Sequence, residues 1–500
     1  MNPHSGGSDT AKMKILVAIS SFGTSQDQYL LQMIEEYRSM PFDLDIVVLS
    51  NIPKEVAPGV EVIVGLPDEK DPWSLVYAHK SLFAKRVEDY DLFIHTENDI
   101  LITESHIRAF LRVSAVLRDD EITGFMRFET GPDGETNFPD VHASFHWDGR
   151  SVVTRGEYTL AYFTNEQAAC YVLTREQLRR AINSGGYVVA PHLGKYGICE
   201  SAATDPYTQC GFKKLICISH IDEFLVHHMS NKYVKKVGIE RPEFQILLDA
   251  LMEIGKTRDA TSSLFPTETK LKRARYSKDY YERLRSDVVS LVPSKARSVL
   301  SLGCGWGATE EWLAKKGLRV VAVPLDSVIS SCAEARGLET VNGDFKTVRQ
   351  KLEGQRFDCL LISNGLHLVD DPVAVISSFA SLLSEDCTVI ALVPNLSQLP
   401  GLRKRIRDDR GIGGLLRSYR QTGVHYTSPR VLHKWFKRAG FRIETVLNFL
   451  PVRAGAIHQM TLGLVDSWLA EDLLVVARRR RAQPHLATSA EMTRAVKRAG

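Results

Sequence analysis

The stretch Ser298-Val299-Leu300-Ser301-Leu302-Gly303-Cys304-Gly305-Trp306-Gly307 decides the fold of the C-terminal half of the chain. An apolar run with strand character ends at three alternating glycines, and a helical pattern begins at Glu310. In a strand–turn–helix unit of this kind, glycine lets the backbone approach a ligand that a Cβ would touch. The N-terminus of the helix adds unpaired N–H groups and a favourable dipole. The stretch therefore predicts a ligand site at the end of a strand.

The glycine spacing alone also fits a dinucleotide-binding fold, because Ala308 completes a G-x-G-x-x-A pattern. The segments that follow narrow the choice, since strand patterns and polar residues alternate at regular spacing. They are the strand 319–323 with Asp326 after it, the turn Asn342-Gly343-Asp344, the strand 357–363 with His367 after it, and the strand 389–393.

This series, over about residues 275–450, resembles the class I S-adenosylmethionine-dependent methyltransferases. The resemblance implies a Rossmann-like α/β domain whose cofactor is S-adenosyl-L-methionine. The glycines Gly303, Gly305 and Gly307 would meet the methionine part of the cofactor. Asp326 would hold the ribose hydroxyls, and Asp344 would meet the adenine.

Two positions depart from the pattern of that family, which usually has an acid where Ser301 and Pro324 stand. The nearest acid to the second position is Asp326, two residues later. These departures permit the alternative that the C-terminal half is a non-catalytic binding or assembly module. The glycine spacing leaves a second alternative open, an NAD-dependent oxidoreductase. In the methyltransferase interpretation, His367 is the candidate proton acceptor, and a packed histidine at a helix start is its structural alternative.

The N-terminal half begins with strand–helix–strand alternation, which predicts an α/β sheet with ligands at the carboxyl ends of its strands. The apolar strands are expected at 14–19, 45–50 and 60–64. A further strand, within 90–96, runs directly into Glu97-Asn98-Asp99. Hard oxygen ligands at this place suit Mg²⁺ or Mn²⁺ held together with substrate phosphates. The alternative is a solvated turn with capping acids.

The whole of 13–235 resembles nucleotide-sugar glycosyltransferases of the GT-A fold. That resemblance implies a divalent metal that bridges the diphosphate of a nucleotide-sugar donor. Asp99 and Glu97 would be metal ligands, with Asn98 in place of a middle acid. A late ligand would come from His228 or His227, for which a surface or core histidine is the alternative.

The general base that deprotonates the acceptor hydroxyl would be Glu200 or Asp205, either of which would otherwise cap a helix. Both acids are expected in a loop. A nucleotidyltransferase, which also uses acids and Mg²⁺, is the alternative for this half of the chain.

Composition predicts five segments in the chain of 500 residues. They are a disordered N-terminus at 1–12, a GT-A-like domain at 13–253, a polar linker at 254–275, a methyltransferase domain at 276–480 and a basic tail at 481–500. The methyltransferase domain is expected to open with a helix at 276–291.

The net charge of +3 excludes a nucleic-acid binder, and the eight scattered cysteines suit a reducing cytosol. No run approaches the roughly 20 apolar residues of a membrane span, so a cytoplasmic protein is expected. The basic residues within 402–407 suit a phosphate, a sugar acid or an anionic membrane surface, which would place the protein at the inner membrane face. A solvated helix face is the alternative for this segment.

Taken together, the two resemblances predict an α/β protein with two domains and two transferase activities. One half would transfer a sugar from a nucleotide-sugar donor to a glycan acceptor, and the other would methylate an oxygen of a glycan. Polysaccharide synthesis is the setting that this combination implies.

Overall fold

The computed structural model describes residues 12–258, 261–271, 273–398, 418–449 and 469–480. The chain divides into two compact units. Unit 1 comprises 1–282 with 305–307 and 324–337, and unit 2 comprises 283–304, 308–323 and 338–500. The expected disordered N-terminus up to residue 11, the basic segment 402–407 and the basic tail 481–500 lie outside the described residues.

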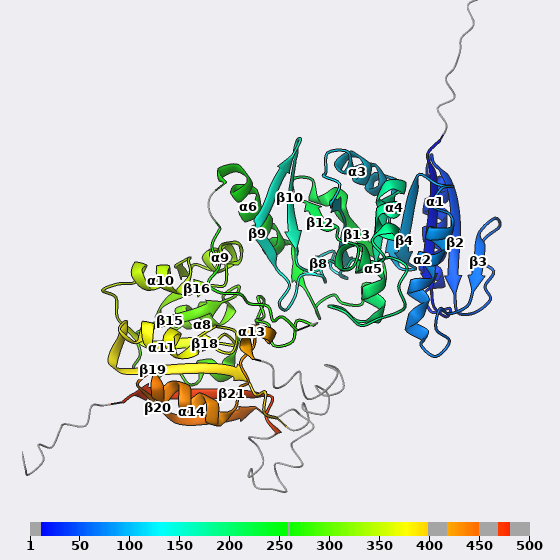
Figure 1. Ribbon diagram of the computed structural model, residues 1–500. Coiled ribbons are helices and arrows are strands. Elements are labelled where there is room, and N and C mark those ends of the chain that lie inside the picture. Colours follow the sequence, from blue (N-terminus) through cyan, green and yellow to red (C-terminus); the bar gives the residue numbers. More distant parts are fainter. Residues whose placement is uncertain (1–11, 259–260, 272, 399–417, 450–468, 481–500) are drawn as a thin grey trace, which may run out of the picture. The chain divides into compact units, whose positions relative to one another are not determined.

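Unit 1 begins with a five-stranded sheet of order β11-β4-β1-β2-β3 (Figure 1). The first four strands along the chain pair in parallel, and β11 runs antiparallel to β4. Ile15 to Ile19 in β1 are fully buried, as continuous apolar runs in parallel sheets are. The strands are β1 (Lys14–Ser21), β2 (Asp43–Ser50), β3 (Glu61–Val64), β4 (Leu92–Glu97) and β11 (Cys170–Thr174).

Helices separate these strands along the chain, as the expected strand–helix–strand alternation requires. Thr174 caps the helix after β11, because its hydroxyl accepts the N–H of Gln177 at 3.2 Å. The helices are α1 (Asp27–Ser39), the 3-10 helix η1 (Pro72–Tyr77), α2 (Ala78–Lys85), α3 (Glu104–Ser114) and α4 (Arg175–Asn183).

Two further sheets, one of four and one of five strands, complete unit 1, with strand orders β6-β12-β10-β9 and β14-β8-β7-β13-β5. The strands of the first are β6 (Glu121–Thr123), β9 (Trp147–Arg155), β10 (Tyr158–Phe163) and β12 (Lys213–Cys217). Those of the second are β5 (Ile100–Leu101), β7 (Met126–Thr130), β8 (Thr136–Phe138), β13 (Leu225–His228) and β14 (Ile239–Glu240). The helices are α5 (Ile198–Thr208), η2 (Ile221–Phe224), α6 (Arg241–Thr257) and α9 (Ser327–Ala335).

Two expectations for helical segments, one in unit 1 and one where unit 2 begins, are wrong. Glu200 and Asp205 lie in helix α5, which contains Pro206, and not in a loop. The helix expected at 276–291 is reduced to α7 (Ser286–Val289). The backbone of Tyr280 is engaged elsewhere, because its N–H donates to the carbonyl of Ala143 and its own carbonyl accepts the N–H of Trp306. These bonds take the groups that a helix would pair internally.

Unit 2 is built on a seven-stranded sheet of order β17-β16-β15-β18-β19-β21-β20. Strand β18 pairs in parallel with β15 and β19, whereas β21 runs antiparallel to both of its neighbours. The strands are β15 (Ser298–Cys304), β16 (Arg319–Pro324), β17 (Glu339–Thr340), β18 (Phe357–Ser363), β19 (Leu383–Pro394), β20 (Phe441–Phe449) and β21 (Asp472–Arg479).

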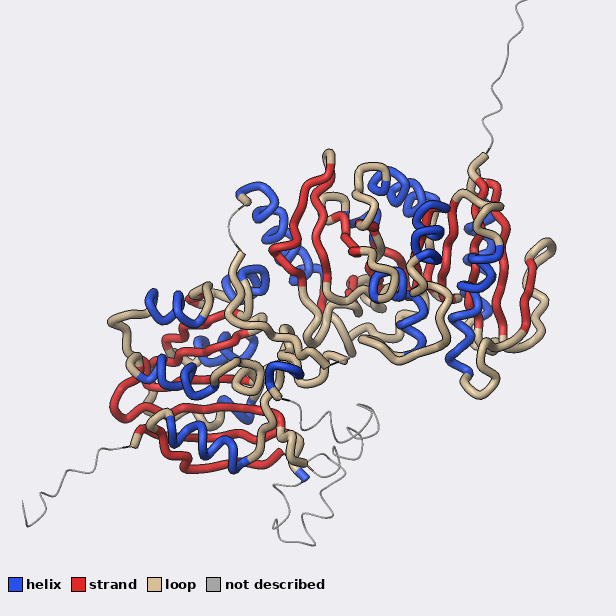
Figure 2. Tube along the Cα trace, in the orientation of Figure 1, coloured by secondary structure: helices blue, strands red, loops and turns tan. Residues whose placement is uncertain are grey.

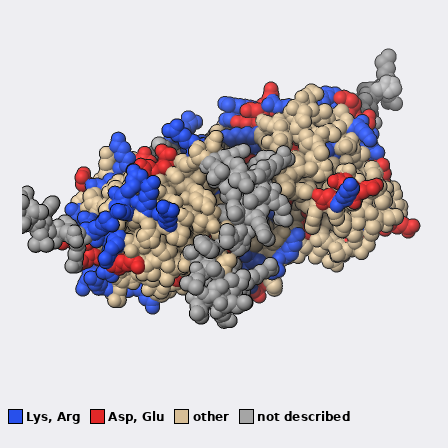
Figure 3. Space-filling view, turned by 60° about the horizontal axis from the view of Figure 1, so that its bottom comes forward, with Lys and Arg blue, Asp and Glu red and all other residues tan. Residues whose placement is uncertain are grey.

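Helices alternate with these strands, as the red and blue segments of Figure 2 show. They are α8 (Ala308–Lys315), α10 (Phe345–Lys351), α11 (Pro372–Ala380), α13 (Tyr419–Thr422) and α14 (Pro429–Arg438). Lysine and arginine side chains gather on the face of this unit seen at the left of Figure 3. Helix α14 alone exposes Arg430, Lys434, Lys437 and Arg438. Within the described ranges, no helix combines the length and the apolar character needed to cross a bilayer.

Candidate functional sites

The glycine-rich turn at the end of β15 lies where the strand order of the seven-stranded sheet reverses, between β15 and β18. Ligands of open α/β sheets bind at the carboxyl ends of strands at such a switch point. Gly303 and Gly307 have φ values of 80° and 90°, which favour glycine. Gly305 has a different reason, because a Cβ there would clash with the carbonyl of Tyr280. That glycine is therefore required by the protein's own backbone.

Ser301 stands on β15, two residues before Gly303, and is buried. Its hydroxyl donates a hydrogen bond of 2.6 Å to Oε1 of Glu310, in the first turn of α8. A carboxylate is thus present beside the position where the sequence lacks one. The sequence pattern does not identify this pair, because the two residues are nine positions apart on different elements.

Asp326 follows β16 and caps α9, since its Oδ1 accepts the N–H groups of Val328 and Ile329 at 2.8 and 2.9 Å. It is buried, and burial raises its pKa. One carboxylate oxygen is thus committed to the helix, whatever the other binds. The role of Asp326 on the ribose stays a prediction.

Asp344 caps α10, where its carboxylate accepts the N–H of Thr347 at 2.7 Å. This backbone hydrogen bond lowers its pKa. His367 lies in the turn after β18 and is 1% exposed, and its carbonyl accepts the N–H of His425 at 2.8 Å. The segment that holds His425 also packs on this turn, because Tyr419 donates to the carbonyl of Leu368 at 2.7 Å. The roles of Asp344 and His367 stay predictions.

The residues at the end of β15 fit S-adenosylmethionine. The left-handed backbone at Gly303 and Gly307 shapes a turn that can approach a ligand closely, and a buried carboxylate with a hydroxyl partner offers an acceptor for a cation.

The first sheet of unit 1 has its own switch point, between β1 and β4. The two strand ends are joined by Asn98, whose backbone N–H donates to the carbonyl of Ser20 at 3.1 Å. The Asn98 side-chain amide donates to the hydroxyl of Ser21 at 3.0 Å, and Lys54 donates to the same hydroxyl at 2.8 Å. Asn98 therefore fixes the ends of β1 and β4 beside Glu97 and Asp99.

The two acids, Glu97 and Asp99, have opposite electrostatic environments. Burial, followed by the charge of Asp99, raises the pKa of Glu97 from 4.5 to about 7. Burial acts to raise the pKa of Asp99 as well, but hydrogen bonds from His228 and Ser230 and the charge of His228 hold it below its usual range. Asp99 is thus ionised at neutral pH, whereas Glu97 is near the midpoint of its titration there.

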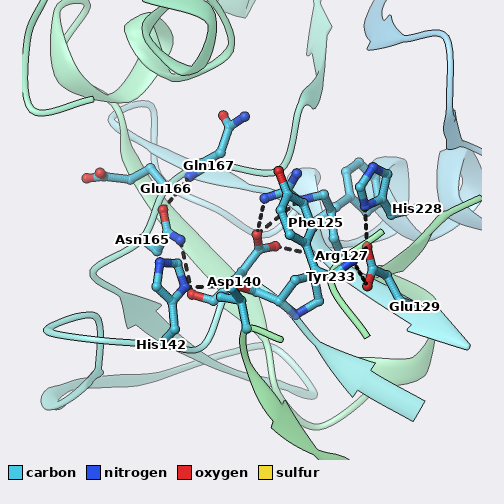
Figure 4. A network of polar contacts seen from close by, with 12 residues as sticks. Phe125, Arg127, Glu129, Asp140, His142, Asn165, Glu166, Gln167, His228 and Tyr233 are labelled. Carbon is cyan, nitrogen blue, oxygen red and sulfur yellow. Dashed lines mark hydrogen bonds and ion pairs between the residues drawn. The ribbon is translucent and has the colours of Figure 1, made fainter. Parts of the chain in front are cut away.

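His228 contacts three polar side chains, and Figure 4 shows it beside one of them, Glu129. Its Nδ1 is 2.7 Å from Oε1 of Glu129, and its Nε2 is 3.1 Å from Oδ2 of Asp99 and 2.9 Å from the hydroxyl of Ser230. His227, the alternative ligand, stacks instead on Phe128 with ring centroids 4.9 Å apart. The two histidines point to opposite faces because they are neighbours on a strand.

Arg127 is the main cation of this network, and it forms a forked ion pair with Asp140 at 2.9 and 2.5 Å (Figure 4). Burial opposes its charge, but Asp140 and Glu97 together raise its pKa. Asn165 donates to the carbonyl of Asp140 and so orients that segment. Arg127 and Glu129 were not identified from the sequence. The signal was there, since two charged residues alternate in the short strand β7.

The proposed metal ligands are brought together only in part. Asp99 and His228 are in contact, and Glu97 is close enough to feel the charge of Asp99. No group of three or more His, Cys, Asp or Glu in the described part of the chain is arranged to hold a metal ion. The protein side of this site alone therefore offers a pair of donors and not a complete ligand set.

The two candidate bases on α5 differ in their surroundings. Asp205 is fully buried and forms an ion pair with Lys80, and burial raises its pKa. Glu200 lies half-buried in the first turn of α5, and its charge acts on Glu97. Of the two candidate bases, Glu200 is therefore the one whose charge acts on the pair Glu97 and Asp99.

Comparison with known proteins identifies the class of the domain that contains the seven-stranded sheet. The family model of a methyltransferase domain matches residues 273–446. The ubiquinone biosynthesis O-methyltransferase of Xylella fastidiosa (strain 9a5c) is 27% identical over 169 residues, which are 33% of this chain and 68% of that protein. The trans-aconitate 2-methyltransferase of Mycobacterium ulcerans (strain Agy99) is 28% identical over 125 residues, which are 24% of this chain and under half, 46%, of that protein.

Among solved structures, an S-adenosylmethionine-dependent methyltransferase from Mesorhizobium loti is 19% identical. The match covers 39% of this chain and 96% of that chain, with a TM-score of 0.29. The family match and the relatives define the class of this part of the protein: residues 273–446 are a class I S-adenosylmethionine-dependent methyltransferase domain.

Proposed function

We propose that the domain at 273–446 transfers a methyl group from S-adenosylmethionine to a hydroxyl oxygen of its acceptor. The observation that carries the proposal is the family match over the glycine turn at the switch point of the seven-stranded sheet. Similarity to the ubiquinone biosynthesis O-methyltransferase of Xylella fastidiosa adds support, because that relative is an O-methyltransferase. A glycan is the acceptor class that we propose.

The cofactor supplies a methyl group activated on a sulfonium. The chain's own contribution is to place the acceptor oxygen in line with that carbon, and orientation is the larger part of catalysis in such reactions. As the O–C bond forms and the C–S bond breaks, the hydroxyl proton must move to a base. We propose His367 for this role, because it follows β18 at the switch point.

Calorimetric titration of the full-length protein with S-adenosylhomocysteine tests this function. Binding with a micromolar dissociation constant is the expected result. The acceptor class is then tested by transfer of tritium from methyl-labelled S-adenosylmethionine to glycans. No detectable binding of S-adenosylhomocysteine would overturn the proposal and leave a binding or assembly module as the better description.

We propose glycosyl transfer from a nucleotide sugar as a second function, which would occur at the switch point of β1 and β4. The observation in its favour is the convergence of Asp99, Glu97 and His228 beside Arg127 at this strand end. Mg²⁺ in phosphate-transfer sites is often held by one or two carboxylates plus the substrate phosphates. The pair Asp99–His228 therefore suits a divalent ion that binds together with the donor. Glu200 is our candidate for the acceptor's base.

Release of UDP or GDP from nucleotide sugars, with and without Mn²⁺, tests this second function. Nucleoside diphosphate in the presence of Mn²⁺ is the expected product. Release of pyrophosphate from a nucleoside triphosphate and a sugar phosphate would identify a nucleotidyltransferase instead.

A further inference from the structure

A buried carboxylate without a cationic partner lies behind the glycine turn of the methyltransferase domain. Glu310 is 7% exposed, and the hydroxyl of Ser301, itself buried, is its hydrogen-bond partner at 2.6 Å. Within the described residues, Glu310 forms no ion pair. Removal of a carboxylate from water is costly, and one hydroxyl offsets only part of that cost.

The helix alone does not explain the inward direction of Glu310. An acid in the first turn of a helix is stabilised by the dipole wherever its side chain points. The next residue, Glu311, has the same advantage and forms an ion pair with Lys315 on the surface at 2.6 Å. The Glu310 side chain instead points toward β15, where it accepts the hydrogen bond of Ser301. This arrangement points to a ligand for the carboxylate.

The position of the pair indicates which kind of ligand. Ser301 stands two residues before Gly303, close to the carboxyl end of β15, which borders the switch point of the sheet. A carboxylate held there has only acceptor oxygens to offer. Its natural partner is a compact cation with several N–H donors, and a charge-assisted bond of this type is short and strong.

We propose that Glu310, held in place by Ser301, binds the α-ammonium group of the methionine part of S-adenosylmethionine. The acid that the sequence lacks at position 301 is thus supplied from the adjoining helix. This inference rests on the proposed methyltransferase function. It assigns to Glu310 a role in cofactor binding.

The variant Glu310→Gln tests the assignment, because glutamine keeps the size of the side chain and removes its charge. Calorimetric titrations with S-adenosylhomocysteine and with 5′-methylthioadenosine are compared. The first ligand has the ammonium group, whereas the second lacks it and retains the nucleoside. We expect the affinity for S-adenosylhomocysteine to fall about 10- to 100-fold and the affinity for 5′-methylthioadenosine to be unchanged.

Two further variants sharpen the test. Glu311→Gln removes a neighbouring acid of the same helical turn and should leave both affinities at the wild-type values. The double variant Ser301→Asp/Glu310→Ser returns the carboxylate to the strand and should restore most of the affinity for S-adenosylhomocysteine. Retained binding of 5′-methylthioadenosine by Glu310→Gln shows that the variant is folded.

The remaining outcomes each overturn the assignment. Unchanged binding of S-adenosylhomocysteine by Glu310→Gln would remove Glu310 from the site. An equal loss of both ligands would give it a structural role only. A loss for 5′-methylthioadenosine alone would place it at the nucleoside and not at the ammonium group. If the wild-type protein binds no S-adenosylhomocysteine, the methyltransferase function itself fails, and the inference with it.

Discussion

Among single residues, Glu97 links its own protonation to the stability of unit 1. Burial and Asp99 raise its pKa from 4.5 to about 7. The folded state therefore holds this proton more tightly than the unfolded state does. The stability that the neutral carboxyl contributes is fully present below about pH 4.5 and is lost as the pH rises through about 7.

We therefore expect Glu97→Gln to gain stability relative to the wild type between pH 5 and pH 8, by about 1–3 kcal/mol. Urea unfolding of both proteins across this range measures the difference. Asp99→Asn serves as the control, because loss of the neighbouring charge should weaken the pH dependence. A stability difference that stays constant with pH would contradict the shifted pKa of Glu97.

A second residue-scale prediction concerns the buried ion pair of Lys80 and Asp205. Burial lowers the pKa of Lys80 and raises that of Asp205, so each charge depends on the other. Lys80→Met would leave the buried carboxylate of Asp205 with His192, whose Nε2 is 3.3 Å from Oδ1, as its remaining ion-pair partner. We expect the loss of Lys80 to cost about 3 kcal/mol in the free energy of unfolding. The double variant Lys80→Met/Asp205→Leu should recover most of that loss. A single variant as stable as the wild type would show that Asp205 is not held as an anion.

At the scale of secondary structure elements, the apolar strands could be predicted from the sequence. Long buried runs such as Ile15–Ile19 have few alternatives. The helix expected at 276–291 failed because tertiary hydrogen bonds of Tyr280 with Ala143 and Trp306 override local helical spacing. The contact of His228 with Glu129 was out of reach for a similar reason, because pairing between distant strands leaves no local pattern.

The segment around Tyr280 also leads to a prediction for Gly305. A Cβ at this position would clash with the Tyr280 carbonyl, and the backbone of residues 280–282 has little freedom because Trp306 bonds to it twice, through its backbone N–H and its indole N–H. We expect Gly305→Ala to lower the thermal midpoint and to weaken binding of S-adenosylhomocysteine at least tenfold, as calorimetry would measure.

Gly194→Ala is a matched control for that variant. Its Cβ would meet its nearest neighbours at 3.8 Å, an ordinary contact distance, so both readouts should remain at the wild-type values. Wild-type behaviour of Gly305→Ala would mean that the turn accommodates a side chain and that the glycine is not required by Tyr280.

At the scale of the whole molecule, two of the four sheets in the described residues, the one that contains β1 and the one that contains β15, each have a switch point with charged residues beside it. The methyltransferase domain occupies about a third of the chain, so its activity gives no role to the cluster of Glu97, Asp99 and His228 in unit 1. Buried acids with perturbed pKa values beside a fixed histidine are typical of functional sites. This is the physical reason to seek a second activity in the same protein.

If two chemistries coexist, a variant of one site should leave the other intact. Asp99→Asn keeps the size of the side chain but removes the charge that faces His228. We expect it to reduce the release of nucleoside diphosphate at least 100-fold, whereas the dissociation constant for S-adenosylhomocysteine should stay within twofold of the wild-type value. Asp249→Asn, which alters an exposed acid of α6, should change neither measurement. Full diphosphate release by Asp99→Asn would exclude Asp99 from the reaction, and a simultaneous loss of S-adenosylhomocysteine binding would mean that the variant damages the fold.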